Sequence, residues 1–517
     1  MRRIAAGALL GIFVLQSFCA SLRKSPTFDE PAHIAAGVSY LATGVFRANL
    51  QHPPLLKEIA AVFAMAGAGV RWPDTEAARA LIANPPGASG LEWTVGNGLI
   101  ARGGPDRVLF WARLPMILIA ALLGLAIHLW ARQMLGGAAA LGALLLFAFD
   151  PVILAHSYLV TTDVGLAAFT VLFFLGLWNY CERPAARRIL WCGVALGAAL
   201  ASKYSAVLLA PVALALLVAA RGRRGVGPFL AICAVAFGVV EGAFLLHSPM
   251  LYLEGIRRVN ADHDLHYLAF FAGEFGRHFY GYFAGAYLLK EPLAAVAAAA
   301  VGLMVQARGL RGKDGPRLHL LFLLLPPAVL FLAYSIAADE LGVRYLIPAL
   351  PFAFLLGGSG LAWLWRRAVW GRGAAVLLCA WLVLEAAAIY PDHLSYFNES
   401  ACLFYDPAKI GPDGGSRCGP AWLDDSNVDW GQGLQQLRSW LDTHGVRGPI
   451  RFAYFGSFPP QNYGIDSTTP DPRAAPSPGV YAVSAHYLPR LVSAGGWFAE
   501  REPAAVVGHA IYVYVVP

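Results

Sequence analysis

Acidic side chains stand at two places where the sequence changes from polar to strongly apolar. Asp29 and Glu30 lie a few residues after the first apolar segment, and Asp163 lies at or just inside the start of another. An ionisable side chain at the edge of an apolar segment is a candidate for function, because a charge in hydrocarbon is costly. A carboxylate at such a boundary can accept the proton of a hydroxyl nucleophile. We therefore predict that Asp29, Glu30 and Asp163 form a catalytic set.

Each acidic position also has a purely structural interpretation. Acids in the first turn of a helix interact favourably with the helix dipole, and Thr27 could cap a helix that begins near Glu30. At Asp163 the structural interpretation is also a helix cap, for which Thr161 and Thr162 supply the hydroxyl groups. The local sequence leaves both interpretations open.

Basic side chains recur in the same kind of polar turn. The cations are Lys57, Lys203, Lys290 (beside Glu291) and Arg344. Cations of this kind can bind an anionic lipid phosphate and neutralise it as a leaving group. For Arg344, an ion pair with Asp339 or Glu340 is a structural alternative.

The elements that must position these residues are long apolar segments. The chain has 517 residues, of which 58% are hydrophobic and only 14% are charged, whereas soluble domains carry about a quarter charged residues. Runs of about 20 apolar residues can cross a membrane as helices. We predict about eleven spans, at 3–22, 109–131, 134–150, 160–180, 189–202, 204–220, 226–247, 284–306, 318–338, 346–365 and 374–391. The region 189–220 is short for two crossings, so we expect a hairpin of short or broken helices that turns at 202–205.

Basic residues also predict the orientation of the chain in the membrane. Arginines and lysines gather in every second connection between the predicted spans, and such connections remain cytoplasmic. The chain is therefore expected to be a multi-pass protein of the cytoplasmic (inner) membrane, with a cytoplasmic N-terminus and an extracytoplasmic C-terminus. The net charge of +7 then reflects topology and does not indicate nucleic-acid binding. The first segment could instead be a cleaved signal peptide.

The chain divides into two predicted domains. Residues 1–391 form a transmembrane catalytic domain that includes the outer loop 23–108, where 30–41 and 54–65 have the pattern of interfacial helices. Residues 392–517 form a small extracytoplasmic α/β domain, with a helix at 431–444 and strands at 450–455, 480–485 and 510–516. A second outer loop covers 248–283.

Two further features leave alternatives open. Cys402 and Cys418 both fall in the predicted outer domain, where a disulfide can persist, although two independent cysteines are an equal alternative. Asp262, His263, Asp264 and His266 could bind a metal, but a solvated loop explains this weak pattern better. Metal dependence is therefore unknown, and no organic cofactor is indicated.

Short motifs along nearly the whole chain carry a resemblance to a known family. The chain resembles bacterial GT-C glycosyltransferases, namely the dolichyl-phosphate-mannose-protein mannosyltransferase and aminoarabinose-transferase-like enzymes of the glycosyltransferase family 39 type. The motifs are Ser25-Pro26-Thr27-Phe28-Asp29-Glu30-Pro31-Ala32-His33, Gln51-His52-Pro53-Pro54-Leu55, Phe149-Asp150-Pro151 with Thr162-Asp163, Ala201-Ser202-Lys203-Tyr204-Ser205, Lys290-Glu291-Pro292, Val343-Arg344-Tyr345-Leu346-Ile347-Pro348, Tyr396-Phe397-Asn398-Glu399 and Asp425-Ser426-Asn427-Val428-Asp429-Trp430-Gly431-Gln432.

This resemblance implies a GT-C fold, a polyprenyl-phosphate-linked sugar donor and an inverting transfer on the outer face of the membrane. It also implies that Asp29 is the catalytic base and Asp163 the second required acid. The implied phosphate contacts are Lys57, Lys203, Lys290 and Arg344. Some relatives have Lys-Pro-Pro where this chain has His52-Pro53-Pro54, so Lys57 or a protonated His52 would replace that contact.

We therefore expect a polyprenyl-phosphate-dependent hexosyl or pentosyl transferase that acts on an acceptor hydroxyl. Its expected partners are the lipid-linked donor, membrane lipids and an acceptor that the sequence does not identify. The main alternative is a transporter or flippase of a lipid-linked glycan, although transporters place ionisable residues near the membrane midplane. A catalytically inactive membrane scaffold is a third possibility.

Overall fold

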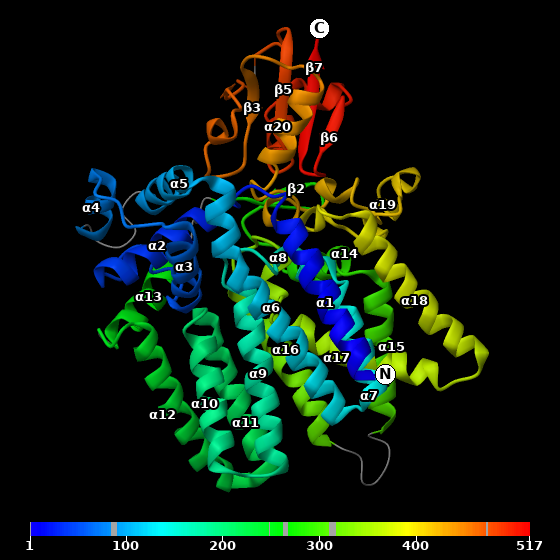
Figure 1. Cartoon of the computed structure of the whole chain (residues 1–517). Coiled ribbons are helices and arrows are strands. Elements are labelled where there is room, and N and C mark those ends of the chain that lie inside the picture. Colours follow the sequence, from blue (N-terminus) through cyan, green and yellow to red (C-terminus); the bar gives the residue numbers. More distant parts are fainter. Residues whose placement is uncertain (1, 84–89, 248, 262–266, 310–316, 472–473) are drawn as a thin grey trace.

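Each predicted span corresponds to one helix or to a pair of consecutive helices. The computed structural model describes residues 2–83, 90–247, 249–261, 267–309, 317–471 and 474–517. The apolar helices are α1 (Arg2–Ser21), α6 (Pro105–Met134), α7 (Gly137–Ala148), α9 (Asp163–Glu182), α10 (Ala186–Leu200), α11 (Leu209–Arg221), α12 (Val226–Ala243), α14 (Tyr282–Lys290), α15 (Leu293–Gly309), α16 (Arg317–Ala337), α17 (Leu350–Trp365) and α18 (Val369–Ala388). Figure 1 shows them as one helical body with the C-terminal sheet at one end.

The chain is a multi-pass membrane protein. Six helical segments among the described residues are long and apolar enough to cross a membrane, or seven if the bent pair α14–α15 counts as one. One of them, Tyr204–Ala243, contains α11 and α12, and the apolar helices α7 and α17 are shorter than a full span. The count of eleven therefore stays a prediction.

Two regions of the predicted spans differ in detail from straight helices. The region 189–220 forms α10, a turn, the 3₁₀ helix η1 (Tyr204–Leu208) and α11, which matches the expected hairpin of broken helices. The predicted span 284–306 is instead two helices bent by 109°. Glu291 precedes Pro292 and is extended, which is the conformation that a residue before proline prefers. Helix α14 therefore ends at Lys290.

The first long loop folds into four helices that lie together at the sheet end of the helical body (Figure 1). They are α2 (Glu30–Thr43), α3 (Leu55–Ala68), α4 (Glu76–Ala83) and α5 (Leu91–Gly103), and the first two confirm the helices predicted at 30–41 and 54–65. The other connections contain α8 (Pro151–His156), η2 (Gly222–Gly225), α13 (Met250–Ala261), the hairpin β1 (Ala269–Phe271) and β2 (Glu274–Gly276), and η3 (Val343–Leu346).

The region after α18 has two parts. Residues up to 433 form short turns against the helical body, namely η4 (His393–Ser395), α19 (Ser400–Leu403), η5 (Pro407–Lys409), η6 (Gly419–Ala421) and η7 (Asp425–Asn427). Cys402 and Cys418 form a disulfide here. The boundary at residue 392 stays a prediction, because the turns that follow it contact the helices through residues such as Asn398 and also contact the sheet domain, as in the pairs of His509 with Asp392 and Asp413.

The second part is a five-stranded mixed sheet in the order β4-β3-β5-β7-β6. Strand β3 (Ile450–Ala453) is parallel to β4 (Ser467–Thr468) and β5 (Gly479–Ser484), while β7 (Ile511–Val516) is antiparallel to β5 and to β6 (Ala505–Val507). The helical elements are α20 (Leu434–Thr443), η8 (Pro460–Tyr463), α21 (Tyr487–Ser493) and η9 (Trp497–Glu500). The predicted strands and helix of this domain are confirmed.

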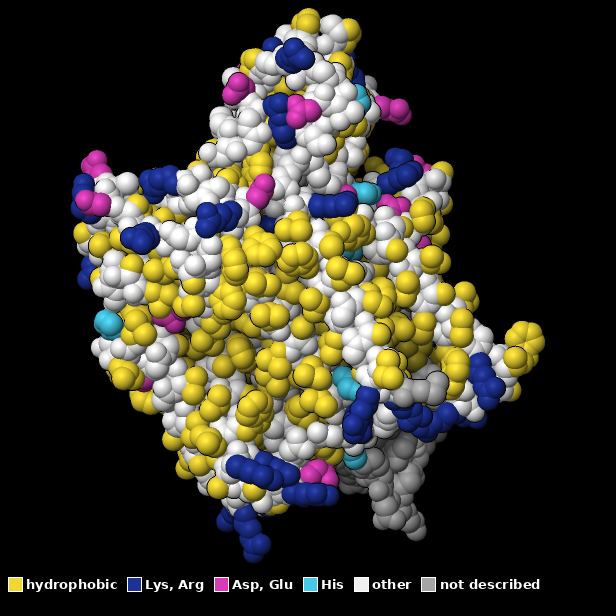
Figure 2. Space-filling model, viewed as in Figure 1, with side chains coloured by type: hydrophobic (Ala, Val, Ile, Leu, Met, Phe, Trp, Pro, Cys, Tyr) yellow, Lys and Arg dark blue, Asp and Glu magenta, His cyan; other side chains and the backbone are white. Residues whose placement is uncertain are grey.

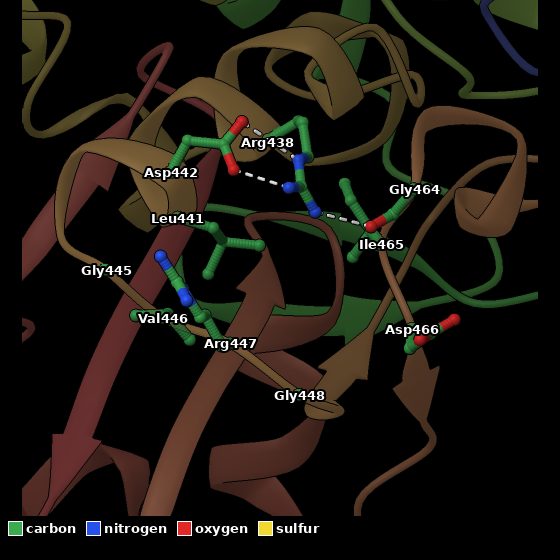
Figure 3. Close-up of a pocket in the computed structure, with 10 residues that line it drawn as sticks. All are labelled: Arg438, Leu441, Asp442, Gly445, Val446, Arg447, Gly448, Gly464, Ile465 and Asp466. Carbon is green, nitrogen blue, oxygen red and sulfur yellow. Dashed lines mark hydrogen bonds and ion pairs between the residues drawn. The ribbon is translucent and has the colours of Figure 1, made fainter.

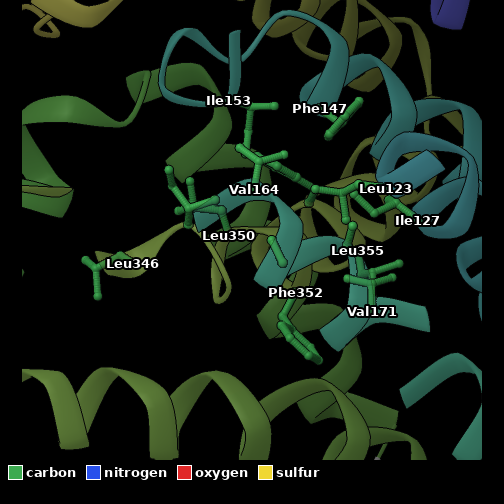
Figure 4. Packing of buried hydrophobic residues seen from close by; sticks show 14 of the residues in the cluster. Leu123, Ile127, Phe147, Ile153, Val164, Val171, Leu346, Leu350, Phe352 and Leu355 are labelled. Atoms are coloured by element: carbon green, nitrogen blue, oxygen red, sulfur yellow. The ribbon is translucent and has the colours of Figure 1, made fainter. Parts of the chain in front are cut away.

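The helices pack around a continuous apolar core. In Figure 4, side chains such as Leu123, Phe147, Val171 and Phe352 meet between α6, α7, α9 and α17. Helix α17 approaches α7 so closely that a Cβ on Gly358 would lie 2.3 Å from the carbonyl oxygen of Ala139, which is the close contact that small residues permit between membrane helices. The surface in Figure 2 shows a broad hydrophobic band, with Lys and Arg side chains along the edge near the sheet and along the edge farthest from it.

Candidate active site

The first pair of predicted site residues meets between the first loop and the turn before α17. Asp29 is the N-cap residue of α2, yet among the described residues its carboxylate makes no capping hydrogen bond. Its Oδ2 instead accepts a hydrogen bond from Arg344 Nη1 at 3.2 Å, and 23% of the Asp29 side chain is exposed. The Arg344 guanidinium also lies 4.3 Å from the centroid of the Trp430 ring. The alternative partner Glu340 contacts His278 at 2.9 Å.

The second predicted pair lies at the start of α9. Asp163 is buried, and its Oδ1 accepts a hydrogen bond from Lys203 Nζ at 2.6 Å. Lys203, from the turn between α10 and η1, also lies 4.4 Å from the centroid of the Tyr345 ring. Since Tyr345 is adjacent to Arg344, the segment 344–345 contacts both the Asp163–Lys203 pair and Asp29.

Electrostatics also joins the two pairs into one site. Burial alone would lower the pKa of Arg344, but the negative charges of Asp29 and Asp163 raise it above its usual range. Burial and the nearby cations, including Lys203 and Arg344, hold the pKa of His52 well below its usual range. These charges oppose protonation of His52 in this structure, and its role as a phosphate contact stays a prediction.

Glu30, the third predicted catalytic acid, lies fully buried behind this site. It accepts hydrogen bonds from Arg113 Nε (2.8 Å) and Nη2 (2.6 Å), and from the main-chain nitrogens of Thr27 (2.9 Å) and Val160 (3.1 Å). Although burial raises the pKa of a carboxyl group, the Arg113 guanidinium and these donors hold the pKa of Glu30 below its usual range. Its lone pairs are occupied, so Glu30 fixes the loop that carries Asp29.

Arg113 was not found by sequence reasoning. It lies inside α6, is fully buried, and donates further hydrogen bonds to the carbonyl oxygens of Ser21, Lys24 and Ser25 at 2.8–2.9 Å. A single arginine in an otherwise apolar predicted span was the available signal, because such a charge needs a buried partner.

Lys57 and Lys290, two predicted phosphate contacts, bind the protein's own main chain. Lys57 Nζ donates to the carbonyl oxygens of Asn49 (2.7 Å) and His52 (2.6 Å), and burial lowers its pKa to about 7. Lys290 Nζ donates to the carbonyl oxygens of Leu394 (2.8 Å) and Asn427 (2.6 Å). The first holds the loop before α3, and the second holds the segment after α18.

The segment 425–432 contributes residues that sequence reasoning had noted only as a motif. Asp425 adopts a left-handed conformation (φ 54°) and accepts a hydrogen bond from Tyr267 at 2.8 Å. Burial raises the pKa of Asp425, and the nearby positive charge of Arg344 opposes this rise. Trp430 lies beneath Arg344, as described above. These residues were missed because nothing local indicates that residues after the last span return to the first loop.

The possible metal ligands Asp262, His263, Asp264 and His266 lie outside the described residues. Within the described part of the chain, no group of three or more His, Cys, Asp or Glu side chains is arranged to hold a metal ion.

Among the cavities of the described residues, two bear on the site, and neither is lined by a member of the two pairs. One of about 460 Å³ is on the sheet domain, where Arg438 is already paired with Asp442 at 2.5 Å and bonded to the carbonyl oxygen of Gly464 (Figure 3). The other, of about 260 Å³, is an apolar groove between α14, α16 and α17 that begins at Leu346, two residues after Arg344. Its lining includes Tyr287, Leu323, Pro327, Phe331, Leu346 and Leu350.

The fold and these paired charges define a multi-pass helical membrane protein with acid–base pairs at the ends of its helices. Residues 106–252, which include Asp163 and Lys203, match the family described as dolichyl-phosphate-mannose-protein mannosyltransferase. A sequence comparison with curated proteins finds no match.

Solved structures are similar to the chain over most of its length. ArnT from Cupriavidus metallidurans in the apo state aligns with 98% of this chain and 96% of that chain, at 13% identity and a TM-score of 0.50. ArnT from the same organism bound to undecaprenyl phosphate aligns with 98% of this chain and 97% of that chain, at 12% identity and a TM-score of 0.49. A third structure is the oligosaccharyltransferase AglB from Archaeoglobus fulgidus in complex with an inhibitory peptide and a dolichol-phosphate. It aligns with 77% of this chain and 59% of that chain, at 12% identity and a TM-score of 0.45. The match to apo ArnT shows that the chain has the GT-C fold, so the resemblance is confirmed for the fold.

Proposed function

We propose that the chain is a membrane glycosyltransferase that moves a sugar from a polyprenyl-phosphate carrier to an acceptor hydroxyl group. The observation that carries this proposal is the meeting of two acid–base pairs, Asp29–Arg344 and Asp163–Lys203, from four separate segments. The partial match to the mannosyltransferase family and the GT-C fold support it. The sugar is a hexose or pentose.

In the proposed reaction, Asp29 is the general base. Its carboxylate accepts the proton of the acceptor hydroxyl as that oxygen forms a bond to the anomeric carbon. The bond between the anomeric carbon and the phosphate oxygen breaks, and its electron pair leaves with the polyprenyl phosphate. Attack from the face opposite the leaving group inverts the anomeric configuration. Asp29 suits this role because part of its carboxylate is exposed.

Arg344 and Lys203 are the cations that would stabilise the departing phosphate. Positive charges held in place before reaction stabilise charge that develops in the transition state without reorganising. Nε of Arg344 is buried and lacks a hydrogen-bond partner among the described residues, so a phosphate oxygen that reached it would satisfy this donor. Asp163 would hold Lys203 in position. Lys57, Lys290 and Glu30 would support the site from behind, since their polar atoms already bind the protein.

The apolar groove beside Leu346 is the proposed position of the first isoprene units of the donor. It opens among membrane helices, and it begins two residues from the cation proposed to bind the phosphate. An anionic head at Arg344 and a hydrocarbon tail in this groove would satisfy both parts of the lipid.

For localisation we propose the cytoplasmic membrane, with the sheet domain and the candidate site outside. The basic connections at one end of the helices support this orientation. Reporter fusions should place residues 225 and 370 in the cytoplasm and residues 60 and 450 outside. A cytoplasmic sheet domain would contradict the proposal.

The transporter alternative is less well supported by the position of the charges. The two pairs do not lie in mid-helix positions. Asp29 is the N-cap residue of α2, and Asp163 is the first residue of α9. Lys203 directly precedes η1, and Arg344 lies in η3 before α17. Transporters tend to place such groups near the membrane midplane on paired broken helices.

The test combines identification of the acceptor with a direct assay. Mass spectrometry of envelope glycolipids and glycoproteins, with and without the gene, should reveal an acceptor that loses one sugar. The purified chain should then transfer that sugar from its polyprenyl-phosphate donor, and Asp29→Asn should not. An unchanged glycolipid and glycoprotein profile, or transfer that requires a nucleotide sugar alone, would contradict the proposed function.

A further inference from the structure

Trp430 contacts Arg344 and Phe28, the residue before Asp29, through different atoms. Its carbonyl oxygen accepts a hydrogen bond at 2.8 Å from the main-chain nitrogen of Phe28, the residue before Asp29. Its ring lies beneath the guanidinium of Arg344, with 4.3 Å between Cζ and the ring centroid. One residue therefore fixes the main chain that carries the acid and the side chain that carries the cation.

The conformation of Trp430 is itself tightly fixed. The side chain is buried, with 2% exposed, and its main-chain nitrogen donates to Gln432 Oε1 at 2.6 Å. The next residue, Gly431, has φ 89° and donates to Asp429 Oδ1 at 2.9 Å. A side chain at 431 would be strained by this backbone and would meet the Tyr454 hydroxyl at 2.9 Å. The turn thus presents the indole in one orientation.

The first loop depends on the same turn over several residues. Ser25 donates from its main-chain nitrogen to the carbonyl oxygen of Gln432 (3.2 Å) and from its hydroxyl to that of Gly431 (3.0 Å). Ser457 Oγ of the sheet domain donates to the carbonyl oxygen of Phe28 at 2.6 Å. The loop before Asp29 is therefore aligned by the polypeptide that follows the last apolar helix.

From this arrangement we propose that Trp430 is a positioning residue that holds the Arg344 guanidinium against Asp29, in the orientation that binds the donor phosphate. This inference rests on the proposed function and extends it to the C-terminal segment. A cation over an indole face is attracted by the ring quadrupole, most strongly when both are removed from water. Without the ring, the Arg344 guanidinium would keep its contacts with Asp29 and with the Tyr345 ring but lose its shortest aromatic contact, and we expect it to adopt other rotamers.

The test is a double-mutant cycle on the full-length purified chain. Trp430→Leu removes the aromatic face, Trp430→Phe keeps a weaker one, and Arg344→Ala removes the cation. Trp440→Leu is the matched control, because Trp440 lies on α20 and stacks on His444 at 4.1 Å, away from the two pairs. The readouts are kcat and KM for a polyprenyl-phosphate sugar, binding of polyprenyl phosphate alone, and thermal unfolding.

We expect Trp430→Leu to lower kcat/KM by about tenfold or more, and Trp430→Phe to retain activity within about threefold. The kcat/KM of the double variant Trp430→Leu, Arg344→Ala should be within about twofold of that of Arg344→Ala alone, because both changes remove the same contact between Trp430 and Arg344. Trp440→Leu should leave both kinetic constants unchanged. Binding of polyprenyl phosphate should weaken in Trp430→Leu and be restored by Trp430→Phe.

The inference would be overturned if the reductions in kcat/KM of the two single variants multiply in the double variant. Equal reductions in kcat/KM for Trp430→Phe and Trp430→Leu would also overturn it. If Trp430→Leu does not fold, the cycle is run with Trp430→Phe and Arg344→Lys, and multiplied losses there overturn it too. A wild-type chain that neither binds polyprenyl phosphate nor transfers from its sugar overturns the proposed function itself. If the wild type is active but the reductions in kcat/KM multiply in the double variant, only the role of Trp430 is overturned.

Discussion

Arg344 donates a hydrogen bond to the carboxylate of Asp29 at 3.2 Å across 315 positions of sequence. The contact exists only when the loop after α1 meets the turn before α17. It matters for the proposed reaction because the base and the cation for the leaving group are held on the same side of one small site. The Asp163–Lys203 pair repeats this arrangement, with an acid at a helix start and a cation in a turn.

Asp29→Asn should lower turnover by about 100-fold or more, because the amide cannot accept the proton of the acceptor. The variant should insert and unfold like the wild type, since the asparagine oxygen can still accept from Arg344. Rates of transfer from the polyprenyl-phosphate sugar test this. Asp466→Asn, at an exposed acid of the sheet domain, is the control. Near-normal turnover by Asp29→Asn would remove Asp29 as the base.

Glu30→Gln should act mainly on stability and less on chemistry. It breaks a buried ion pair and leaves the Arg113 charge unpaired, which costs about 3–5 kcal/mol in comparable sites. Thermal unfolding and the yield of folded protein in detergent measure this loss. A stable Glu30→Gln protein that has lost turnover would instead favour the catalytic role predicted from the sequence.

Lys203→Met and Lys57→Met should have different effects, although both remove a predicted phosphate contact. Lys203 faces Asp163 and the candidate site, so its loss should raise KM for the donor and lower kcat, together by about tenfold or more. Lys57 binds two carbonyl oxygens of its own loop, so its loss should lower the unfolding temperature with little change in KM. Steady-state kinetics and thermal unfolding of both variants decide this. A higher donor KM in Lys57→Met alone would reverse the assignment.

His509 predicts a pH dependence for the attachment of the sheet domain. Burial lowers its pKa, but hydrogen bonds to Asp392 (3.0 Å) and Asp413 raise it to about 9. An unfolded histidine has a pKa of about 6.5, so the stabilisation is complete below that pH and is lost as pH rises through about 9. We expect roughly 1 kcal/mol, because a third of the imidazole is exposed and screened.

The check is thermal unfolding of the wild type and His509→Gln between about pH 6 and pH 9.5, the range that brackets the two pKa values. The wild type should lose its advantage over the variant across this range. Other groups titrate in both proteins, so their effects cancel in the difference. Parallel curves would show that His509 does not contribute.

Several parts of the site were accessible from sequence, and others were not. Asp29, Asp163, Lys203 and Arg344 were found because each is a charge at the edge of an apolar segment, where charges are rare. The same argument selected Lys57 as a ligand contact, and its contacts to carbonyl oxygens in its own loop could not be foreseen. Hydrogen bonds to main-chain carbonyls have no signature in the side-chain sequence.

What the sequence by itself determined is the set of apolar helices, the strands of the sheet domain and the identity of the four charges in the two pairs. These follow from local properties, namely hydrophobic run length and alternation. Tertiary structure alone decided that Arg344 pairs with Asp29, that Arg113 engages Glu30, and that Trp430 reaches back to Phe28. The physical reason is that a buried charge must find a partner somewhere, but only the packed helices determine which partner lies within hydrogen-bonding distance.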